Sequence, residues 1–344
     1  MKKKVFIDCD TGIDDALAFV LACSSNDIEI IGVTTVGGNV SLENTTRNTC
    51  NVLNLLGRSD IKVAKGAEKP LKRELMKASG VHGVNGLRGW SFSSNYTDNL
   101  VEDKAWDFMA SSIMASEEKV IICALAPVTN IALMLEKYPE VKENIDSIVF
   151  MGTSWHDGNP SPIATFNVLV DPEAFKAVLF SGVKVVAAPL DTLRNGTIIY
   201  RSELDSLLED GSEVGRFVYS IINSCGVANI GKDEIIDSKN EEAIFEERIN
   251  RAKNEEHSIL DPAVLAMVIK PELFTFSHYY CDVECQGTLT TGFTLIDKKN
   301  WYGKKEEEKN LWFAETMNRD GFASLFLEAV KKYGGNKDEN SHRL

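Results

Sequence analysis

The sequence has few cysteines, and none of them are closely paired. The 7 cysteines stand singly, at positions 9, 23, 50, 123, 225, 281 and 285, and no CxxC pair occurs. Cys281 and Cys285 have no neighbouring partners of the kind that a zinc site needs. Cys9 and Cys123 lie in apolar segments, where reduced and buried thiols are expected. The pattern therefore argues against a cysteine-bound zinc ion.

Long apolar runs and an excess of positive charge are also missing. The lysine-rich start is similar to that of a signal sequence, but Asp8 interrupts the apolar residues that follow it. No segment is long enough to span a membrane, so we expect a cytoplasmic protein. Lys and Arg number 37 against 51 Asp and Glu, which gives a formal net charge of −14. This charge argues against nucleic acid or an anionic membrane as a partner and is compatible with a neutral small molecule.

Apolar segments of strand length alternate with helical segments up to residue 190. With 44% hydrophobic and 26% charged residues, the chain has the composition of a globular protein. The alternation predicts an α/β fold, with a mainly parallel central sheet flanked by helices, in a single domain spanning residues 1–344. Strands are expected at 5–8, 28–36, 62–64, 120–125, 147–151 and 183–188, and helices at 14–24, 41–56, 102–115, 128–137 and 172–180.

The remaining segments do not follow this alternation. Residues 69–96 are glycine-rich and lightly apolar, which favours a mobile lid. Residues 200–250 are expected to form peripheral helices, and the charged stretch at about 239–257 is expected to be a solvated helical insertion. A hairpin is expected at 283–296 and a closing helix at 321–332. The loops that follow the strands should converge at one edge of the sheet, where α/β proteins bind ligands.

Four carboxylates stand within eight residues near the start of the chain, in the run Asp8-Cys9-Asp10-Thr11-Gly12-Ile13-Asp14-Asp15. Apolar residues precede and follow this run, which is typical of a strand, a turn and a helix. Because carboxylates this close repel one another, a bound divalent cation with oxygen ligands would stabilise them. Helix capping is an alternative role for Asp14 or Asp15. It leaves Asp8 and Asp10 without a role, so we expect a metal or catalytic site here.

This run resembles the N-terminal signature of the nucleoside hydrolase family, of the inosine-uridine preferring type. Further matches follow in family order and spacing: Gly37-Gly38-Asn39, His82–Leu87, Leu125–Ala132, Met151-Gly152, Gly158-Asn159, Phe166-Asn167, Asp171–Ala174, Asp261-Pro262 and the Gly292-x-Thr294-x-x-Asp297 pattern. The resemblance covers about residues 4–330. It implies an open, Rossmann-like nucleoside hydrolase fold with extra peripheral helices, in a protein that forms homodimers or homotetramers.

The resemblance implies calcium-dependent hydrolysis of the N-glycosidic bond of purine or pyrimidine ribonucleosides, to free base and ribose, in nucleoside salvage. Ca²⁺ would be held by the carboxylates of Asp10, Asp15 and Asp261 and by the main-chain carbonyl of Leu125. All-oxygen coordination is what calcium prefers. Asp10 would also be the general base that takes a proton from a metal-bound water.

The family pattern implies a second group of residues that contact the substrate. Asp14 and Asn39 would bind ribose hydroxyls or orient the neighbouring carboxylates, and Asn159 and Asn167 would hold the ribose near its outer hydroxyls. An asparagine amide suits this role because it both donates and accepts hydrogen bonds. The asparagines could instead be turn-forming residues. Further substrate-binding candidates are His82, Met151, Trp155 and Thr165.

One departure from the family pattern concerns the acid that protonates the leaving base. Many members carry a histidine immediately before the second metal-binding Asp, but here Leu260 stands before Asp261. Members without this histidine stack a purine between aromatic rings. Candidates are Trp155, Trp90 and Trp301 for stacking, and His82, His156 and His257 for a replacement acid. Simple packing is the competing role of the tryptophans, and solvent exposure is expected for His257.

A second departure is Thr165, where the family usually has a glutamate that faces the 5′ end of the ribose. A carboxylate accepts a hydrogen bond from a free 5′-hydroxyl. A short neutral side chain weakens that preference and leaves space. We therefore expect the substrate to be altered or bulkier at the 5′ position, or ordinary nucleosides to react slowly.

Other interpretations of the acidic run compete with this one. Asp8-x-Asp10-Thr11 after a strand also fits the start of a haloacid-dehalogenase-type phosphatase, but Asp14-Asp15 is foreign to that class. An EF-hand loop would place Phe19 at its twelfth position, where a glutamate is needed. A non-enzymatic relative that binds metal and nucleoside without turnover is consistent with both Leu260 and Thr165.

Overall fold

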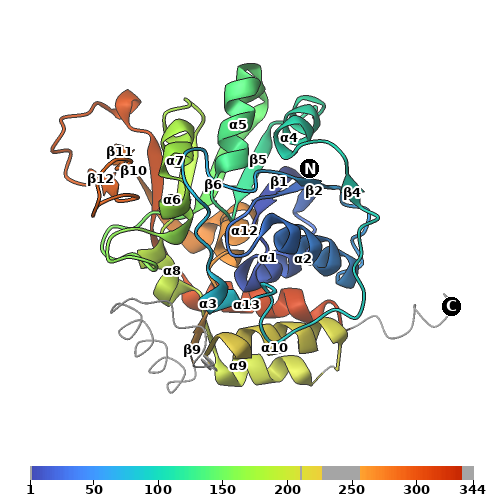
Figure 1. Ribbon diagram of the computed structural model, residues 1–344. Coiled ribbons are helices and arrows are strands. Elements are labelled where there is room, and N and C mark those ends of the chain that lie inside the picture. Colours follow the sequence, from blue (N-terminus) through green and yellow to red (C-terminus); the bar gives the residue numbers. More distant parts are fainter. Residues whose placement is uncertain (1, 210, 227–255, 335–344) are drawn as a thin grey trace.

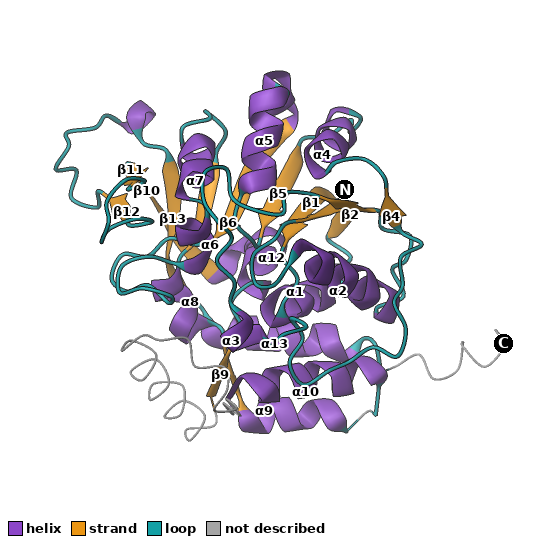
Figure 2. Cartoon of the chain, in the orientation of Figure 1, coloured by secondary structure: helices purple, strands orange, loops and turns teal. Residues whose placement is uncertain are grey.

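The computed structural model describes residues 2–209, 211–226 and 256–334, and a nine-stranded sheet forms its centre (Figures 1 and 2). The strand order is β10-β13-β7-β6-β5-β1-β2-β3-β4. Neighbouring strands are parallel, except that the edge strand β10 runs antiparallel to β13. The predicted α/β fold with a mainly parallel sheet is confirmed.

The elements expected in the first 190 residues are present. The strands are β1 (Lys3–Cys9), β2 (Ile28–Thr35), β3 (Val63–Lys65), β5 (Val120–Ala124), β6 (Ile145–Met151) and β7 (Val185–Ala188). The helices between them are α1 (Ile13–Ser24), α2 (Leu42–Leu55), α4 (Ala105–Met114), α5 (Thr129–Lys137) and α7 (Pro172–Leu179). Because β1, β2, β5, β6 and β7 are parallel, the loops that follow them lie at one edge of the sheet.

Alternate side chains of the central strands enter two separate cores. Val5 and Ile7 of β1 join the core that contains α1, α12 (Pro262–Ile269) and α13 (Arg319–Lys331). Phe6 joins the core formed with α4, α5 and α7. Figure 1 shows these two groups of helices on opposite faces of the sheet. Burial of both faces explains why the strands are continuous apolar runs in the sequence.

Several elements were not predicted from the sequence. Strand β13 (Leu311–Met317) pairs with β7 and carries β10 (Phe274–Tyr279) on its other side, and β4 (Leu100–Val101) forms the opposite edge. All eight residues of α12 are buried. A helix without a polar face lacks the periodicity by which surface helices are recognised. The expected late hairpin and closing helix are confirmed, as β11 (Cys281–Val283) with β12 (Thr294–Ile296) and as α13.

Smaller elements surround this framework. They are α3 (Ser79–His82), α6 (Phe166–Val170), α8 (Leu190–Gly196), β8 (Ile198–Tyr200), α9 (Arg201–Asp205), α10 (Glu213–Gly226) and β9 (Glu256–Ser258). The expected peripheral helices are represented by α9 and α10. The predicted charged insertion lies outside the described residues except at its end, where residues 256 and 257 belong to β9. Within the described part of the chain, no helix has the length and apolar character needed to cross a membrane.

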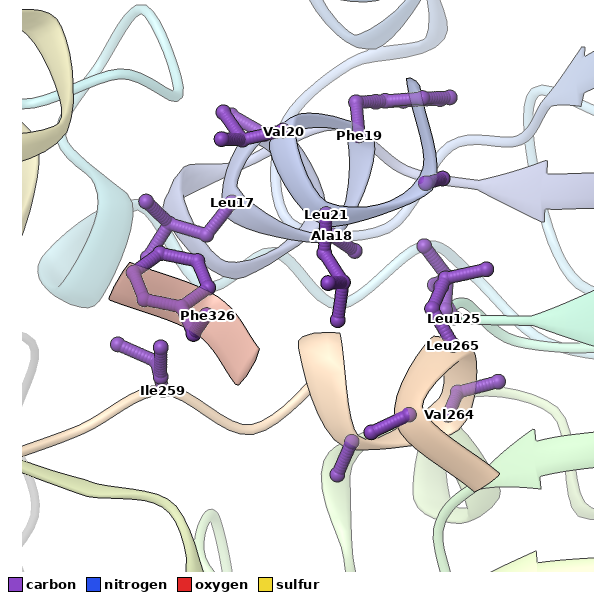
Figure 3. Close-up of a cluster of buried hydrophobic side chains, with 14 of the residues drawn as sticks. Leu17, Ala18, Phe19, Val20, Leu21, Leu125, Ile259, Val264, Leu265 and Phe326 are labelled. Atoms are coloured by element: carbon purple, nitrogen blue, oxygen red, sulfur yellow. The ribbon is translucent and has the colours of Figure 1, made fainter. Parts of the chain in front are cut away.

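Helices α1 and α12, which are far apart in the sequence, pack against each other below the sheet. In Figure 3, Leu17, Ala18 and Leu21 of α1 face the segments that carry Leu265 of α12 and Phe326 of α13, and these residues belong to one buried cluster. Asp15 lies in the first turn of α1, and Asp261 stands at the N-cap of α12. This packing therefore brings the acidic ends of two helices toward the same edge of the sheet, where helix dipoles favour carboxylates.

Candidate active site

Asp10 and Asp15 meet in the turn after β1. The backbone N–H groups of Asp10 and Gly12 donate to the Asp15 carboxylate at 3.1 and 3.0 Å. Asn39, from the turn after β2, donates its backbone N–H to Asp10 Oδ2 at 2.7 Å. Its side-chain amide lies 3.1 Å from Asp10 Oδ1 and 3.2 Å from Asp15 Oδ2. Both carboxylates are buried, whereas Asp14 is partly exposed at the surface of the turn.

Asp261 joins these carboxylates from the start of α12. It is buried, and burial followed by the charges of Asp15, Asp14 and Asp10 raises its pKa well above its usual range. Burial and the charge of Asp15 likewise raise the pKa of Asp10, and burial raises the pKa of Asp15. The structure thus brings Asp261 toward Asp10 and Asp15, the acids near the start of the chain, as the sequence analysis expected.

The chemistry of this acidic group fits a hard cation. Among the ion pairs of the described residues, none involves Asp10, Asp15 or Asp261, so no side-chain cation neutralises them there. Oxygen ligands of this kind suit calcium. No three His, Cys, Asp or Glu side chains in the described ranges are arranged to hold a metal by themselves. Binding would therefore need a shift of a carboxylate, or further oxygen ligands such as the Leu125 carbonyl.

Asn167 ties the ends of two neighbouring strands together beside the carboxylates. Its side-chain amide donates to the carbonyl of Leu125 at 2.8 Å, just after β5, and to the carbonyl of Met151 at 3.0 Å, at the end of β6. A carbonyl oxygen has two lone pairs, so the Leu125 carbonyl can accept this bond and still contact a cation. The predicted positions Leu125, Met151 and Asn167 therefore form one group.

Asp8 lies beneath the turn and differs from the other acids. Its Oδ1 atom accepts hydrogen bonds from the Thr34 hydroxyl at 2.6 Å and from the Asn130 amide at 2.8 Å, while its buried Oδ2 atom has no hydrogen-bond partner among the described residues. Burial raises the pKa of Asp8 to about 7, although these hydrogen bonds lower it in part. Asn130 also donates to the carbonyl of Thr35 and accepts the N–H of Ala67, so it connects β1, β2 and the segment just after β3. The sequence signal for Asn130 was its place in segment 125–132, which matches the family pattern, but that match alone assigned it no role.

His82 contacts the acidic turn directly. Its Nδ1 atom accepts the backbone N–H of Ile13 at 3.1 Å, so the neutral ring carries its proton on Nε2. A general acid would have to be an imidazolium, and a proton on Nδ1 would break this bond. The geometry therefore favours His82 as a hydrogen-bond donor through Nε2 over the replacement acid considered from the sequence. The backbone of the same segment is held to Asn39, whose carbonyl accepts the Ala78 N–H at 3.0 Å.

Asn159 and Thr165 lie in the loop between β6 and α6. The Asn159 side-chain oxygen accepts the N–H of Phe166 at 2.8 Å, which leaves its amide N–H₂ as the group that could donate to a sugar. Thr165 is buried, and its hydroxyl accepts the N–H of Thr153 at 3.1 Å. The alternative structural role considered for Asn159 is thus partly confirmed, because its side chain accepts a hydrogen bond from the start of α6.

The aromatic candidates are dispersed. The Lys298 ammonium lies 3.7 Å from the centre of the Trp155 ring, so one face of that ring is already covered. Trp90 packs edge-to-face with Phe217 at 5.3 Å, and Trp301 is 82% exposed in a turn. His156 is exposed. The expectation that His257 is exposed is wrong, because β9 pairs with β8 and buries its side chain.

Two cavities lie away from the carboxylates. One, of about 660 Å³, opens at the amino-terminal end of the strands and is lined by Lys3, Lys119, Lys184, Val186 and Trp312, among others. The other, of about 470 Å³, lies beside it around His278 and Trp312. Neither contains a residue of the acidic group, so the carboxylates and not cavity size identify the candidate site.

Comparisons with known proteins agree with this geometry. The family model described as inosine-uridine preferring nucleoside hydrolase matches residues 5–324. A pyrimidine-specific ribonucleoside hydrolase RihA from Salmonella newport (strain SL254) is 34% identical over 338 residues, which cover 97% of this chain and 100% of the relative. The protein of the same name from Shigella boydii serotype 4 (strain Sb227) is 35% identical over the same coverage.

Solved structures give the same result. A plant nucleoside hydrolase, PpNRh1, superposes with a TM-score of 0.83 at 26% identity, covering 96% of this chain and 99% of the other. A purine-preferring ribonucleoside hydrolase from Gardnerella vaginalis has a TM-score of 0.83 at 25% identity and the same coverage. The acidic turn, the position of Asp261 and these likenesses along nearly the whole chain lead to one conclusion: the chain belongs to the inosine-uridine preferring nucleoside hydrolase family.

Proposed function

We propose that this nucleoside hydrolase cleaves the N-glycosidic bond of ribonucleosides in a calcium-dependent reaction. The observation that carries the proposal is the convergence of Asp10, Asp15 and Asp261. All three are buried and have raised pKa values, and none forms an ion pair with a cationic side chain in the part of the chain that the structure describes. When bound, Ca²⁺ would neutralise these acids and lower the pKa of the attacking water. The carboxylates named here and the Leu125 carbonyl are its proposed ligands.

In this proposal, Asp10 accepts a proton from the attacking water while the water oxygen bonds to C1′ of the ribose. The electron pair of the broken C1′–N bond leaves with the base, which then takes up a proton. Asn39 holds the Asp10 carboxylate in place through its backbone N–H. Asp14, Asn159 and Asn167 bind the sugar hydroxyls. His82, which contacts the acidic turn, and Met151, at the end of β6, are further proposed substrate contacts.

Pyrimidine nucleosides are the proposed first substrates. The relatives that are 34% and 35% identical bear the name of pyrimidine-specific hydrolases, whereas the purine-preferring structural neighbour is 25% identical. The higher identity supports uridine and cytidine over inosine. Thr165 in place of the usual glutamate supports tolerance of substituents at the 5′ position.

The test is release of free ribose from a panel of nucleosides, with and without a chelator. We expect chelation to abolish release and added Ca²⁺ to restore it. Asp10→Asn should lower kcat by about 10² to 10⁴-fold, the usual contribution of a general base. As a readout apart from activity, Ca²⁺ at 100 times its Kd should stabilise the wild-type protein by about 2.7 kcal/mol.

The possible outcomes distinguish the proposed hydrolysis from its alternatives. Calcium-dependent stabilisation without ribose release would support a non-enzymatic binding relative and contradict the proposed hydrolysis. Ribose release that persists in excess chelator would contradict the proposed role of calcium. An Asp10→Asn variant with full kcat would remove Asp10 as the base.

A further inference from the structure

The loop that joins β6 to α6, residues 152–165, carries Asn159 and Thr165 and leads into Asn167. Its backbone is unusual at the start, where Thr153 has a φ of 72°, in the left-handed region that a β-branched residue rarely adopts. The loop is also tightly folded at Gly158, where an added Cβ would lie 2.1 Å from the carbonyl oxygens of Ser161 and Ala164. Such a conformation persists only when surrounding structure holds it.

Asp191, in the first turn of α8, provides that support. Its carboxylate accepts the backbone N–H of Trp155 at 2.6 Å and the backbone N–H of His156 at 3.0 Å. The Ser154 hydroxyl donates to the carbonyl of Asp157 and lies 3.3 Å from the same Asp191 carboxylate. Two consecutive backbone amides of the loop therefore share one acceptor group, with the Ser154 hydroxyl beside it. Hydrogen bonds to an ionised acceptor are stronger than those between neutral groups.

The same helix also contacts the segment that leads to Asp261. Arg194 donates to the carbonyl of Gly158 at 2.6 Å, and its own carbonyl accepts the Ser258 hydroxyl at 2.9 Å. The carbonyl of Thr197, just after α8, accepts the N–H of Ile259 at 3.3 Å. Helix α8 thus lies between the loop with the sugar-binding candidates and the chain that delivers an acid of the proposed metal site.

We propose that Asp191 is a positioning residue that fixes the 152–165 loop relative to the metal-binding carboxylates. The proposal rests on the function proposed above. Loss of the Asp191 contacts would displace the loop that carries Asn159 and precedes Asn167. Asp10 and Asp15 belong to β1 and α1 and would keep their contacts with Asn39. Asp191 therefore affects sugar binding and alignment, and leaves cation binding unchanged.

The test is the variant Asp191→Asn, which keeps the size of the side chain but turns one acceptor into an N–H₂ group that faces the loop amides. We expect KM to rise and kcat to fall, with kcat/KM about 100-fold lower, the scale of a 1 Å misplacement. The calcium concentration that gives half-maximal thermal stabilisation should equal that of the wild type. Asp191→Glu, which keeps both oxygen acceptors, should recover part of the loss.

Asp205→Asn is the matched control, because Asp205 is an exposed acid on the neighbouring helix α9, where it forms an ion pair with Arg201. Its kcat/KM should stay within about twofold of the wild type. An Asp191→Asn protein with unchanged KM, and with kcat lowered only in proportion to its folded fraction, would overturn the proposal.

A second measurement separates this proposal from the function on which it rests. Hydrogen exchange at the amides of Trp155 and His156 should be faster in Asp191→Asn than in the wild type, because both amides lose their acceptor. If the wild type releases ribose from no nucleoside, the proposed function fails while this measurement still tests the anchor. Unchanged exchange at both amides would overturn the positioning role.

Discussion

Asp8 and Asp10 stand two positions apart, yet their neighbours give them different chemistry. Asp8 is held from below by Thr34 and Asn130, and burial raises its pKa to about 7. Asp10 faces Asn39 and the charge of Asp15. The contacts of Asp8 come from residues 26 and 122 positions away. The acidic run by itself could therefore predict a site here, and only the family resemblance singled out Asp10 as the expected base. The contacts that hold Asp8 could not be predicted.

Thr165 provides a prediction about substrate choice at the scale of one side chain. We expect Thr165→Glu to raise kcat/KM for uridine or inosine, because the new carboxylate can accept a hydrogen bond from the 5′-hydroxyl. A hydrogen bond to a charged group is worth about 1.5–3 kcal/mol, so the gain should be about tenfold or more. Steady-state kinetics with both nucleosides would measure it.

Two controls sharpen this experiment. The gain should be absent with 5′-deoxyuridine, which lacks the hydroxyl, and Thr165→Gln should not reproduce it, because glutamine has nearly the same size without the charge. Lower activity of Thr165→Glu on every unmodified nucleoside would show that the 5′ hypothesis is wrong.

His257 gives a prediction about pH. Burial, and then the charge of Arg201, lower the pKa of His257 below its unfolded value of 6.5. The unfolded chain then binds a proton more readily than the folded chain, so this residue favours the folded state above pH 6.5 and disfavours it as the pH falls further. Compared with a variant that lacks this histidine, we expect the wild type to lose free energy of unfolding, measured with urea, between pH 7.5 and pH 5.5. The raised pKa values of Asp8, Asp10 and Asp261 act in the opposite direction, and they do so equally in both proteins.

The comparison is with two variants. As the pH falls over this range, the free energy of unfolding of His257→Gln should rise relative to that of the wild type, while His156→Gln, at an exposed position, should follow the wild type. Equal slopes for His257→Gln and the wild type would mean that another group causes the acid sensitivity.

At the scale of elements, the site depends on the packing of α1 against α12. Each helix begins with an acid of the site, and each buries an apolar face in the same cluster. Helix α12 could not be recognised from the sequence as a surface helix, because all its residues are buried. Only the Asp261-Pro262 pair marked its start, since proline is favoured in the first turn of a helix.

Leu265 tests this packing. Its side chain is fully buried in α12 and belongs to the same buried cluster as Leu125 (Figure 3). Leu265→Ala should lower the free energy of unfolding by about 2–5 kcal/mol, the range for large cavities in cores. The calcium concentration needed for half-maximal stabilisation should also rise, because Asp261 stands at the start of the loosened helix.

Leu289→Ala is the control, because Leu289 is 90% exposed and its loss should change stability by less than about 0.5 kcal/mol. Chemical denaturation at fixed calcium measures both effects. A destabilised Leu265→Ala protein with unchanged calcium dependence would separate the helix packing from the position of Asp261.

At the scale of the whole molecule, the parallel part of the sheet could be predicted because its strands and helices alternate with clear apolar patterns. The grouping of Asp10, Asp15 and Asp261 could be expected from the family resemblance. The anchoring by Asp191 could not, because its partners Trp155 and His156 come from another loop and are bound through their backbones. Backbone contacts leave no mark in the residue types. Likewise, β13 and its place in the sheet were not predicted. Its residues are of mixed burial, so its sequence lacks the continuous apolar run that marks the other central strands.

The late position of β13 has a consequence for synthesis on the ribosome. Trp312 and Phe313 of β13 pair with Val186 and Ala187 of β7, so the outer rim of β7 has no partner until residue 311 has been made. A chain that ends between residues 262 and 310 would already contain Asp10, Asp15 and Asp261 but would leave an apolar edge of β7 without a partner strand. We therefore expect such fragments to self-associate through the unpaired edge of β7, even though they contain the acidic residues of the site.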